Sequence, residues 1–185
     1  MDEKTESKLH ELEQTKKEFW NIARESAELI FKYITENNYK NIFEIGTSNG
    51  YSTIWLAMAA KQTGGHITSF EFWEKRIVLA EANLEYCSLR EYVDIIQGSA
   101  LDSLKKIDKT NPLDFVLIDA NKKEYIKYFE QLHPMLRPGA MFVADNVISH
   151  KKSVQEFLDA AENHPDYKTY YVEYDGGLLV GEKIK

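Results

Sequence analysis

Apolar runs of strand length alternate with amphipathic helical stretches along most of this chain, and this alternation constrains the fold more than any other feature. Helices are predicted between each of the first six strands. Repeated strand-helix-strand units favour right-handed crossovers and a doubly wound, mostly parallel α/β sheet. The predicted strands are residues 41–46, 66–72, 92–98, 112–120, 140–148, 167–174 and 178–184.

The beginning of the chain departs from this alternation. Residues 7–37 carry apolar side chains at spacings that suit one long helix, which Asn37 and Asn38 end. The helix between the fourth and fifth strands is predicted over residues 122–136. It ends before the Arg-Pro-Gly sequence at 137–139.

The last two predicted strands are joined only by Asp-Gly-Gly at residues 175–177, which is a hairpin signal. The sequence therefore predicts a seven-stranded sheet with a C-terminal antiparallel hairpin. We expect a single domain over residues 1–185, made of an N-terminal helical region (1–37) and a doubly wound core (40–185).

Composition excludes several classes of protein. The net charge of −7 and the pI near 5.3 argue against a broad basic surface for nucleic acid. Cys87 is the only cysteine, which excludes an intrachain disulfide and a multi-cysteine zinc site and fits a reducing cytoplasm. No apolar run approaches the ~20 residues of a membrane span. We therefore expect a cytoplasmic protein that is not in the membrane.

Glycines follow the first predicted strand, at the edge where doubly wound sheets bind ligands. Gly46 and Gly50 are spaced G-x-x-x-G, so they do not match the dinucleotide fingerprint G-x-G-x-x-G. The acidic Glu44 precedes the first glycine and Ser52 follows the second, a combination that suits a cationic ligand better than a diphosphate. A tight strand-to-helix turn with no ligand is the alternative.

Weaker signals follow the second and third strands. Glu71 stands where a carboxylate can accept hydrogen bonds from ribose hydroxyls, although a solvated acid at a strand end would look the same. Ser99 and Ala100 form a small-residue turn that would let a flat ring lie against the backbone, and a helix cap is the alternative.

Oxygen-bearing side chains follow the fourth and fifth strands. Asp119, Asp145 and Asn146 would make a hard oxygen site that suits Mg²⁺ or a similar divalent cation. The alternative is that both aspartates cap helices. Lys122 lies three residues after Asp119 and could act as a general base in the same cleft, with a solvated basic surface as the alternative.

Five motifs taken together resemble those of the class I S-adenosylmethionine-dependent methyltransferases, and specifically the metal-dependent O-methyltransferases of the caffeoyl-CoA and catechol type. The resemblance covers roughly residues 22–147, and its combination of motifs is specific. It implies a Rossmann-like methyltransferase fold, whose last two strands are similar to the predicted hairpin. The motifs are FEIGTSNGYSTIWLA, SFEF, QGSA, LIDANKKEY and LRPGAMFVADNV.

The resemblance also implies roles for individual residues. Glu71 would bind the ribose of S-adenosylmethionine, and Ser99 and Ala100 would flank the adenine. Lys122 matches the catalytic base, and Asp119 belongs to the catalytic, cofactor-binding and metal-binding sets. The residues implied around the methionine part are Glu44, Gly46, Thr47, Gly50 and Ser52, and the implied metal ligands are Asp119, Asp145 and Asn146.

The leading hypothesis is transfer of a methyl group from S-adenosylmethionine to a metal-chelated hydroxyl of a small catechol-like acceptor. A hydroxylated uridine in transfer RNA stays open as the acceptor, because some relatives modify it. An NAD-dependent oxidoreductase and a cofactor-binding protein without catalysis are less favoured hypotheses. The resemblance further implies a homodimer. The short segment at 148–153 and the short region before Ile22 predict an acceptor pocket that is open or completed by a partner subunit.

Overall fold

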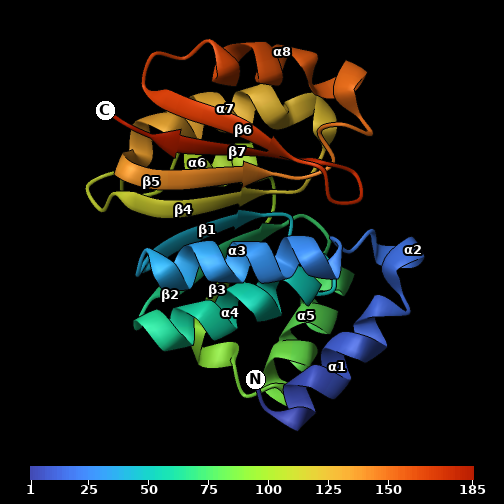
Figure 1. Ribbon diagram of the computed structural model, residues 1–185. Coiled ribbons are helices and arrows are strands. Elements are labelled where there is room, and N and C mark those ends of the chain that lie inside the picture. Colours follow the sequence, from blue (N-terminus) through green and yellow to red (C-terminus); the bar gives the residue numbers. More distant parts are fainter.

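The computed structural model describes residues 1–185 and contains one seven-stranded sheet between two layers of helices (Figure 1). The strand order is β3-β2-β1-β4-β5-β7-β6, in which the first five strands are parallel and β7 runs antiparallel to both β5 and β6. The predicted sheet and terminal hairpin are therefore confirmed. The strands are β1 (Asn41–Ile45), β2 (His66–Glu71), β3 (Val93–Gln97), β4 (Leu113–Ile118), β5 (Leu136–Ala144), β6 (Tyr167–Val172) and β7 (Leu178–Lys183).

Helices cover both faces of the sheet (Figure 1). Helices α1, α3, α4 and α5 lie on one face and α6, α7 and α8 on the other, while α2 lies near the edge where the parallel strands end. No helix is both long and apolar enough to cross a membrane. The helices are α1 (Glu3–Glu13), α2 (Lys16–Phe19), α3 (Arg24–Glu36), α4 (Tyr51–Thr63), α5 (Glu74–Tyr86), α6 (Ala100–Leu104), α7 (Tyr125–Leu132) and α8 (Lys151–Glu162), with 3₁₀ turns η1 (Arg90–Tyr92), η2 (Lys122–Glu124) and η3 (His133–Met135).

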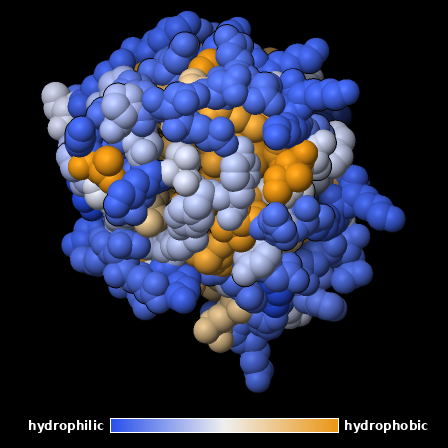
Figure 2. Space-filling model, turned by 45° about the horizontal axis from the view of Figure 1, so that its top comes forward, coloured by the Kyte–Doolittle hydropathy of each residue, from blue (hydrophilic) through white to orange (hydrophobic).

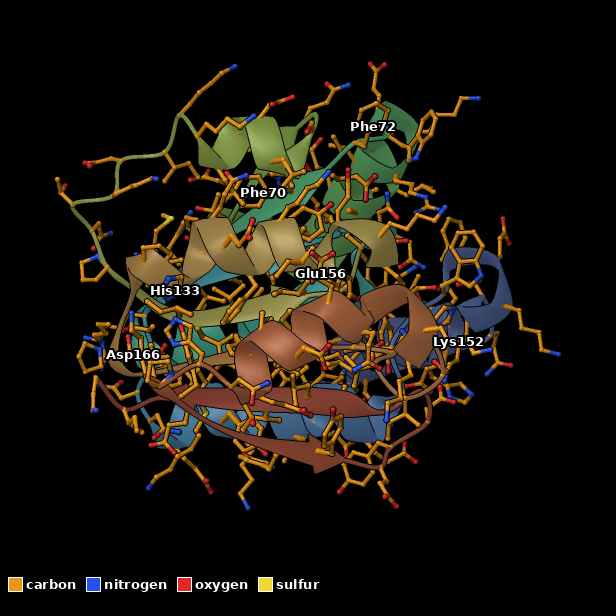
Figure 3. The ribbon with its side chains drawn as sticks, turned by 90° about the horizontal axis from the view of Figure 1, so that it is seen from above. Phe70, Phe72, His133, Lys152, Glu156 and Asp166 are labelled. Carbon is orange, nitrogen blue, oxygen red and sulfur yellow. The ribbon has the colours of Figure 1, made fainter.

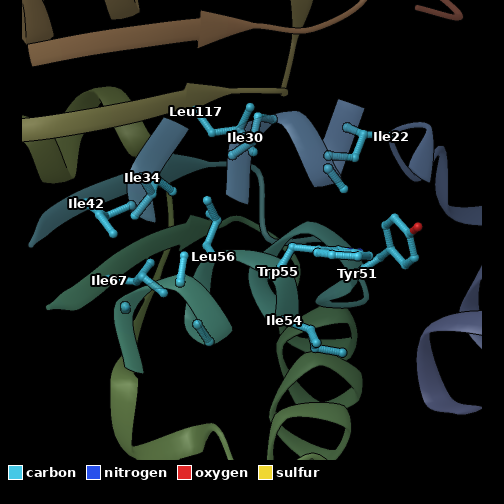
Figure 4. Close-up of a cluster of buried hydrophobic side chains, with 14 of the residues drawn as sticks. Ile22, Ile30, Ile34, Ile42, Tyr51, Ile54, Trp55, Leu56, Ile67 and Leu117 are labelled. Atoms are coloured by element: carbon cyan, nitrogen blue, oxygen red, sulfur yellow. The ribbon is translucent and has the colours of Figure 1, made fainter. Parts of the chain in front are cut away.

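Each helix layer packs its own hydrophobic core against the sheet. On the α3–α4 side, Ile30 and Ile34 meet Ile42 of β1 and Leu56 of α4, and all four are fully buried or nearly so (Figure 4). Burying an aliphatic side chain of this size stabilises the fold by about 1.5–3 kcal/mol. Polar side chains predominate on the outer surface, with hydrophobic residues showing near the middle of the face in Figure 2.

The prediction of one helix over residues 7–37 is wrong, because α1, α2 and α3 replace it. Trp20 ends α2 in the left-handed conformation with φ 55°, and the Asn21 side-chain amide donates to the Leu12 carbonyl at 2.9 Å. A straight helix of this length would extend about 46 Å. The two breaks fold the segment back, so that Leu9 and Ile30 belong to the same core.

The predicted start of the fifth strand is also wrong, because β5 begins before the Arg-Pro-Gly sequence rather than after it. The register of β4 against β5 shifts between Leu113 and Phe115, which accommodates residues 137–140 as an irregular stretch of strand. Arg137 donates to Asp114 at 2.6 Å, and the Tyr39 hydroxyl donates to the Gly139 carbonyl at 2.6 Å. These tertiary contacts hold the proline and glycine within the strand.

The carboxyl ends of β1 to β5 meet at one edge of the sheet because these strands are parallel. Gly46 lets two of them converge closely. Its φ is +107°, and a Cβ at this position would overlap the backbone carbonyl of Asp119 at the end of β4. Only glycine satisfies both conditions, so the loop after β1 and the loop after β4 lie in direct contact.

Candidate active site at the carboxyl ends of the strands

A cleft of about 640 Å³ opens at this edge of the sheet. Residues that follow all five parallel strands line it, together with a segment from the N-terminal region. Three predicted residues, Glu44, Gly50 and Asp145, are not part of its lining. The predicted residues that line it are Gly46, Thr47, Ser52, Glu71, Ser99, Ala100, Asp119, Lys122 and Asn146.

Glu44 lies beneath the cleft and is completely buried. Its carboxylate accepts hydrogen bonds from Ser52, Thr53 and Ser69 hydroxyls, each at 2.6 Å. Burial raises the pKa of Glu44 to about 7, although these three hydrogen bonds act in the opposite direction. Glu44 therefore reaches the cleft through Ser52, whose hydroxyl it orients.

Gly50 serves the packing of two helices. It precedes α4 with φ 86°, and a Cβ there would lie 3.1 Å from the Cα of Ala80 in α5. Thr47, in the loop before Gly50, lines the cleft. The Thr47 hydroxyl is itself fixed by a hydrogen bond of 2.5 Å with Ser69.

Glu71 is only 6 % exposed and is therefore not a solvated acid. One carboxylate oxygen accepts from the Ser48 amide and the other from the Trp73 amide, both at 2.9 Å. Each carboxylate oxygen keeps a further lone pair for a ligand hydroxyl. Glu71 thus ties together the loops that follow β1 and β2 and still presents acceptors to the cleft.

Ser99 caps a helix, as one of the two interpretations predicted, and it also lies at the cleft. Its hydroxyl caps α6 by accepting from the Asp102 amide at 3.4 Å, and the residue also lines the cleft beside Ala100. Glu71 and Phe72 line the same cleft.

Asp119 and Lys122 form an ion pair at the end of β4, with 2.8 Å between Nζ and Oδ1. Lys122 Nζ also donates to the hydroxyl of Tyr125 at 2.6 Å. That hydroxyl lies 3.1 Å from the Ile118 and Asp145 carbonyl oxygens, to which it can donate. The nearby 3₁₀ turn is capped by Asn121 rather than by Asp119, so helix capping does not explain this carboxylate.

Tyr125 is a site residue to which the sequence analysis gave no role. It is fully buried, and burial together with the charges of Asp119 and Asp145 raises the pKa of its phenol well above the usual value. It therefore stays a neutral hydroxyl that fixes the position of Lys122. Tyr125 is the last residue of the LIDANKKEY motif, and this position in the sequence could have indicated a role for it at the site.

Asp145 directly follows β5 and is almost completely buried. Burial, followed by the negative charge of Asp119, holds the pKa of its carboxyl well above the usual range, and the ammonium of Lys122 only partly opposes this. Asn146 donates its amide to Asp145 at 2.6 Å, and its own backbone is left-handed with φ 62°. The single positive charge of Lys122 therefore lies near two carboxylates, whose negative charges repel each other.

These residues fit a divalent cation in their chemistry. Two carboxylates share one ammonium group and lie beside a carboxamide. Oxygen atoms of these groups are the hard ligands that Mg²⁺ prefers. The amide oxygen of Asn146 faces Ser149 at 3.5 Å, so ligation requires a flip of the amide group. No group of three or more His, Cys, Asp and Glu side chains is placed to hold a metal ion anywhere in the chain. A cation here would thus take remaining ligands from water or substrate.

The N-terminal segment forms a wall of the cleft that the sequence analysis did not anticipate. Phe19 and Trp20 line the cleft, and the Phe19 carbonyl accepts from the Ser48 hydroxyl at 3.1 Å. The guanidinium of Arg76 lies 5.5 Å from the centre of the Trp20 ring. The chain itself therefore closes part of the pocket that was expected to be open or completed by a partner.

Only the first residue of the basic run at 150–152 reaches the site. His150 lines the cleft and lies 2.9 Å from the Ser149 hydroxyl through Nδ1. Lys151 and Lys152 are exposed in the first turn of α8, and Figure 3 shows Lys152 at the periphery of the molecule.

Residues 3–170 match the family described as O-methyltransferase, and the chain belongs to this family. The match extends beyond residues 22–147 in both directions. It includes α1 and α2, so the wall formed by Phe19 and Trp20 lies within the family's shared region.

The chain is similar to several known proteins. A catechol O-methyltransferase from Niastella koreensis is 40% identical over 119 residues, which are 63% of this chain and 53% of the relative. Another from Mycobacterium tuberculosis is 37% identical over 121 residues, or 65% of this chain and 54% of the relative. The chain thus spans about half the length of these relatives.

Among solved structures, the O-methyltransferase from Bacillus cereus in complex with SAH is similar over nearly the whole chain. It is 28% identical with a TM-score of 0.84, and the match covers 97% of this chain and 91% of that one. The fold of the sheet and its terminal hairpin is therefore that of this enzyme.

Proposed function

We propose that the protein transfers a methyl group from S-adenosylmethionine to a hydroxyl of a small catechol-like acceptor, with a divalent cation at Asp119, Asp145 and Asn146. The observation that carries this proposal is the meeting, in one cleft, of the Gly46 and Glu71 loops with the Asp119–Lys122 pair. Membership of the O-methyltransferase family and similarity to two catechol O-methyltransferases support it.

The loops after β1, β2 and β3 would hold the cofactor. Glu71 would accept from the ribose hydroxyls with the lone pairs left free by the Ser48 and Trp73 amides. Ser99 and Ala100 would lie against the adenine. Ser52 donates its own proton to Glu44, so its oxygen is free to accept from the cofactor's ammonium.

The loops after β4 and β5 would hold the acceptor. When bound there, a divalent cation would lower the pKa of an acceptor hydroxyl and favour its ionised form. Lys122 Nζ is the proposed recipient of the hydroxyl proton, and it must first release the proton that it now donates to Asp119. Tyr125 keeps Nζ in position throughout.

The transfer itself needs mainly alignment. The S–CH₃ bond breaks as the O–CH₃ bond forms on the opposite side of the carbon, so the acceptor oxygen must lie in line with the sulfur. Two neighbouring hydroxyls on one ring would give the acceptor two attachment points in the acceptor half of the cleft. Trp20 offers an aromatic surface at the cleft wall for such a ring.

Methyl-labelled S-adenosylmethionine with Mg²⁺ tests the proposal against catechols, matched monohydroxy phenols and bulk transfer RNA. We expect label in the catechols, little in the phenols, and its loss with a chelator. Label confined to transfer RNA would reject the small acceptor. Cofactor binding in calorimetry without transfer to any acceptor would reject the enzymatic proposal altogether.

A further inference from the structure

The turn between β6 and β7 holds the loop that carries Asn146. This turn, at residues 175–177, lies at the edge of the sheet where the parallel strands end (Figure 1). Two successive backbone amides of the loop, those of Ile148 and Ser149, donate to the Gly176 carbonyl at 3.0 and 2.9 Å. The backbone just after Asn146 is therefore fixed by a turn that is not itself part of the cleft lining.

Gly176 leaves room beside the side chain of Asn146. A Cβ at position 176 would overlap Oδ1 of Asn146 and would lie 2.9 Å from Oγ of Ser149. Gly177 has φ +81°, whereas Gly176 is not among the glycines with a positive φ. The backbone at Gly176 therefore does not itself require glycine. What requires glycine there is the space that the Asn146 amide occupies.

The Asn146 amide is oriented towards Asp145. Its Nδ2 donates to Asp145 Oδ2 at 2.6 Å, and its Oδ1 lies 3.5 Å from the hydroxyl of Ser149. The first contact is a short hydrogen bond to a carboxylate, and the second is at the limit of a hydrogen bond. A half-turn of the amide exchanges its two ends, so that the oxygen lies beside Asp145 and the nitrogen beside Ser149.

The Ser149 hydroxyl can accept a hydrogen bond from the amide in this second orientation. Its Oγ lies 2.9 Å from Nδ1 of His150, which can accept the single hydroxyl proton. The lone pairs of Oγ are then left for an N–H donor. After the half-turn, Nδ2 of Asn146 would therefore donate to Ser149, while Oδ1 and the Asp145 carboxylate would lie side by side.

We infer that Ser149 is a positioning residue for Asn146, and that Gly176 provides the space in which the amide turns. The inference rests on the proposed function, in which Asn146 supplies an oxygen ligand to a divalent cation. The hydrogen bond to Asp145 favours one orientation of the amide, and a cation together with the Ser149 hydroxyl favours the other. Polar neighbours commonly orient metal ligands in this way.

Calorimetric titration of the full chain with Mg²⁺, without any acceptor, tests the inference. We expect Ser149→Ala to raise the Kd for Mg²⁺ by about tenfold, since loss of a polar neighbour of a ligand weakens metal binding by about 10–100-fold. Gly176→Ala should raise it as well, because the added methyl group displaces the Asn146 amide. Ser153→Ala is the matched control, since Ser153 is exposed in the first turn of α8 and should leave Kd unchanged.

The substitution Asn146→Asp separates the orientation of the ligand from a general structural effect. A carboxylate presents an oxygen in both directions, so it needs no hydrogen bond to select one of them. In the Asn146→Asp background, Ser149→Ala should therefore change the Mg²⁺ Kd by less than about twofold. A merely structural role of Ser149 would give the same loss in both backgrounds. Thermal unfolding and binding of S-adenosylmethionine show that each variant is folded.

The outcomes distinguish this inference from the proposed function. If Ser149→Ala and Gly176→Ala bind Mg²⁺ as the wild type does, while Asp145→Asn does not bind it, only the inference is overturned. An equal loss on Ser149→Ala in the Asn146 and Asn146→Asp backgrounds would also overturn it. A wild type that binds no Mg²⁺ would overturn both the inference and the cation in the proposed function.

Discussion

The two halves of the cleft satisfy their buried acids in different ways. In the half formed after β1 and β2, Glu44 accepts from three hydroxyls and Glu71 from two backbone amides. In the half formed after β4 and β5, a single ammonium from Lys122 faces both Asp119 and Asp145. In the first half, groups of the chain donate hydrogen bonds to both acids. In the second half, there is less positive than negative charge.

This difference indicates what each half is built to receive. Hydrogen bonds inside the chain preorganise the first half, so a ligand finds its partners already in position. The excess negative charge of the second half favours a cation, which would restore the balance of charge when it binds. The contrast predicts opposite consequences for substitutions in the two halves.

The largest effect is expected from Asp145→Asn. Loss of this carboxylate should reduce methyl transfer on the order of a thousandfold, about 4 kcal/mol of barrier, if a cation orients the acceptor. Stability without metal should stay the same or increase, because a buried carboxyl with a raised pKa is removed. Turnover and thermal unfolding of the metal-free protein measure the two effects.

Asp108→Asn is the control for this prediction, since Asp108 is exposed and is not part of the cleft lining. It should change neither turnover nor the response of the melting temperature to Mg²⁺. Full transfer by Asp145→Asn in the presence of a chelator would contradict the role of the cation and remove the contrast between the two halves.

An intermediate effect is expected on the pH dependence of stability. The folded state raises the pKa of Glu44 from 4.5 to about 7, so it binds this proton more tightly than the unfolded chain does. The stabilisation is complete below pH ~4.5 and is lost as pH rises towards 7. Relative to Glu44→Gln, the wild type should lose roughly 3 kcal/mol of unfolding free energy across this window.

Denaturant titrations at about pH 4.5, 5.5, 6.5 and 7.5 measure how the unfolding free energy changes with pH. Each unit of difference in pKa between the folded and unfolded states corresponds to about 1.4 kcal/mol. Glu36→Gln is the control, because Glu36 is exposed on α3 and pairs only loosely with Lys32 at 3.7 Å. If the unfolding free energies of the wild type and Glu44→Gln change with pH in the same way, the hydrogen bonds from the three hydroxyls keep Glu44 ionised. The first half of the cleft would then contain a negatively charged carboxylate.

The smallest effect is expected from Tyr125→Phe. This change removes the hydroxyl that accepts from Lys122, so turnover should fall by about tenfold and unfolding free energy by about 1 kcal/mol. The pH profile of turnover should shift as well, because the environment of Nζ changes. A purely structural role would lower stability and leave the profile unchanged.

Tyr167→Phe is the matched control for Tyr125→Phe. The Tyr167 hydroxyl is buried and has no hydrogen-bond partner, so its removal should not lower stability or turnover. Equal losses in both variants would mean that the hydrogen bond to Lys122 contributes nothing specific to the second half of the cleft.

Much of the architecture could be predicted because the strand runs are strongly apolar and bounded by turn residues. The N-terminal helices could not, since neither glycine nor proline marks the break at Trp20, where the Asn21 side chain reaches back to the Leu12 carbonyl. The irregular start of β5 likewise depends on Arg137 reaching Asp114. Local sequence cannot contain such long-range contacts.

The rule for strand ends led to nine predicted residues that line the cleft, but not to their hydrogen-bond partners. Sequence spacing indicated an acid near the glycines, and the structure places Glu44 beneath Ser52 instead of in the cleft. The direction of a strand side chain depends on register, and that register is set by neighbouring strands.

The position of β7 in the sheet has a consequence for the order of folding. β7 follows β6 in the chain but lies between β5 and β6. β6 has no other strand partner, so it cannot join the sheet before β7 has formed. The strand β7 therefore pairs with β5 either before β6 joins it or together with β6. Until β7 pairs with β5, the outer edge of β5 presents unpaired backbone groups of the kind that promote aggregation.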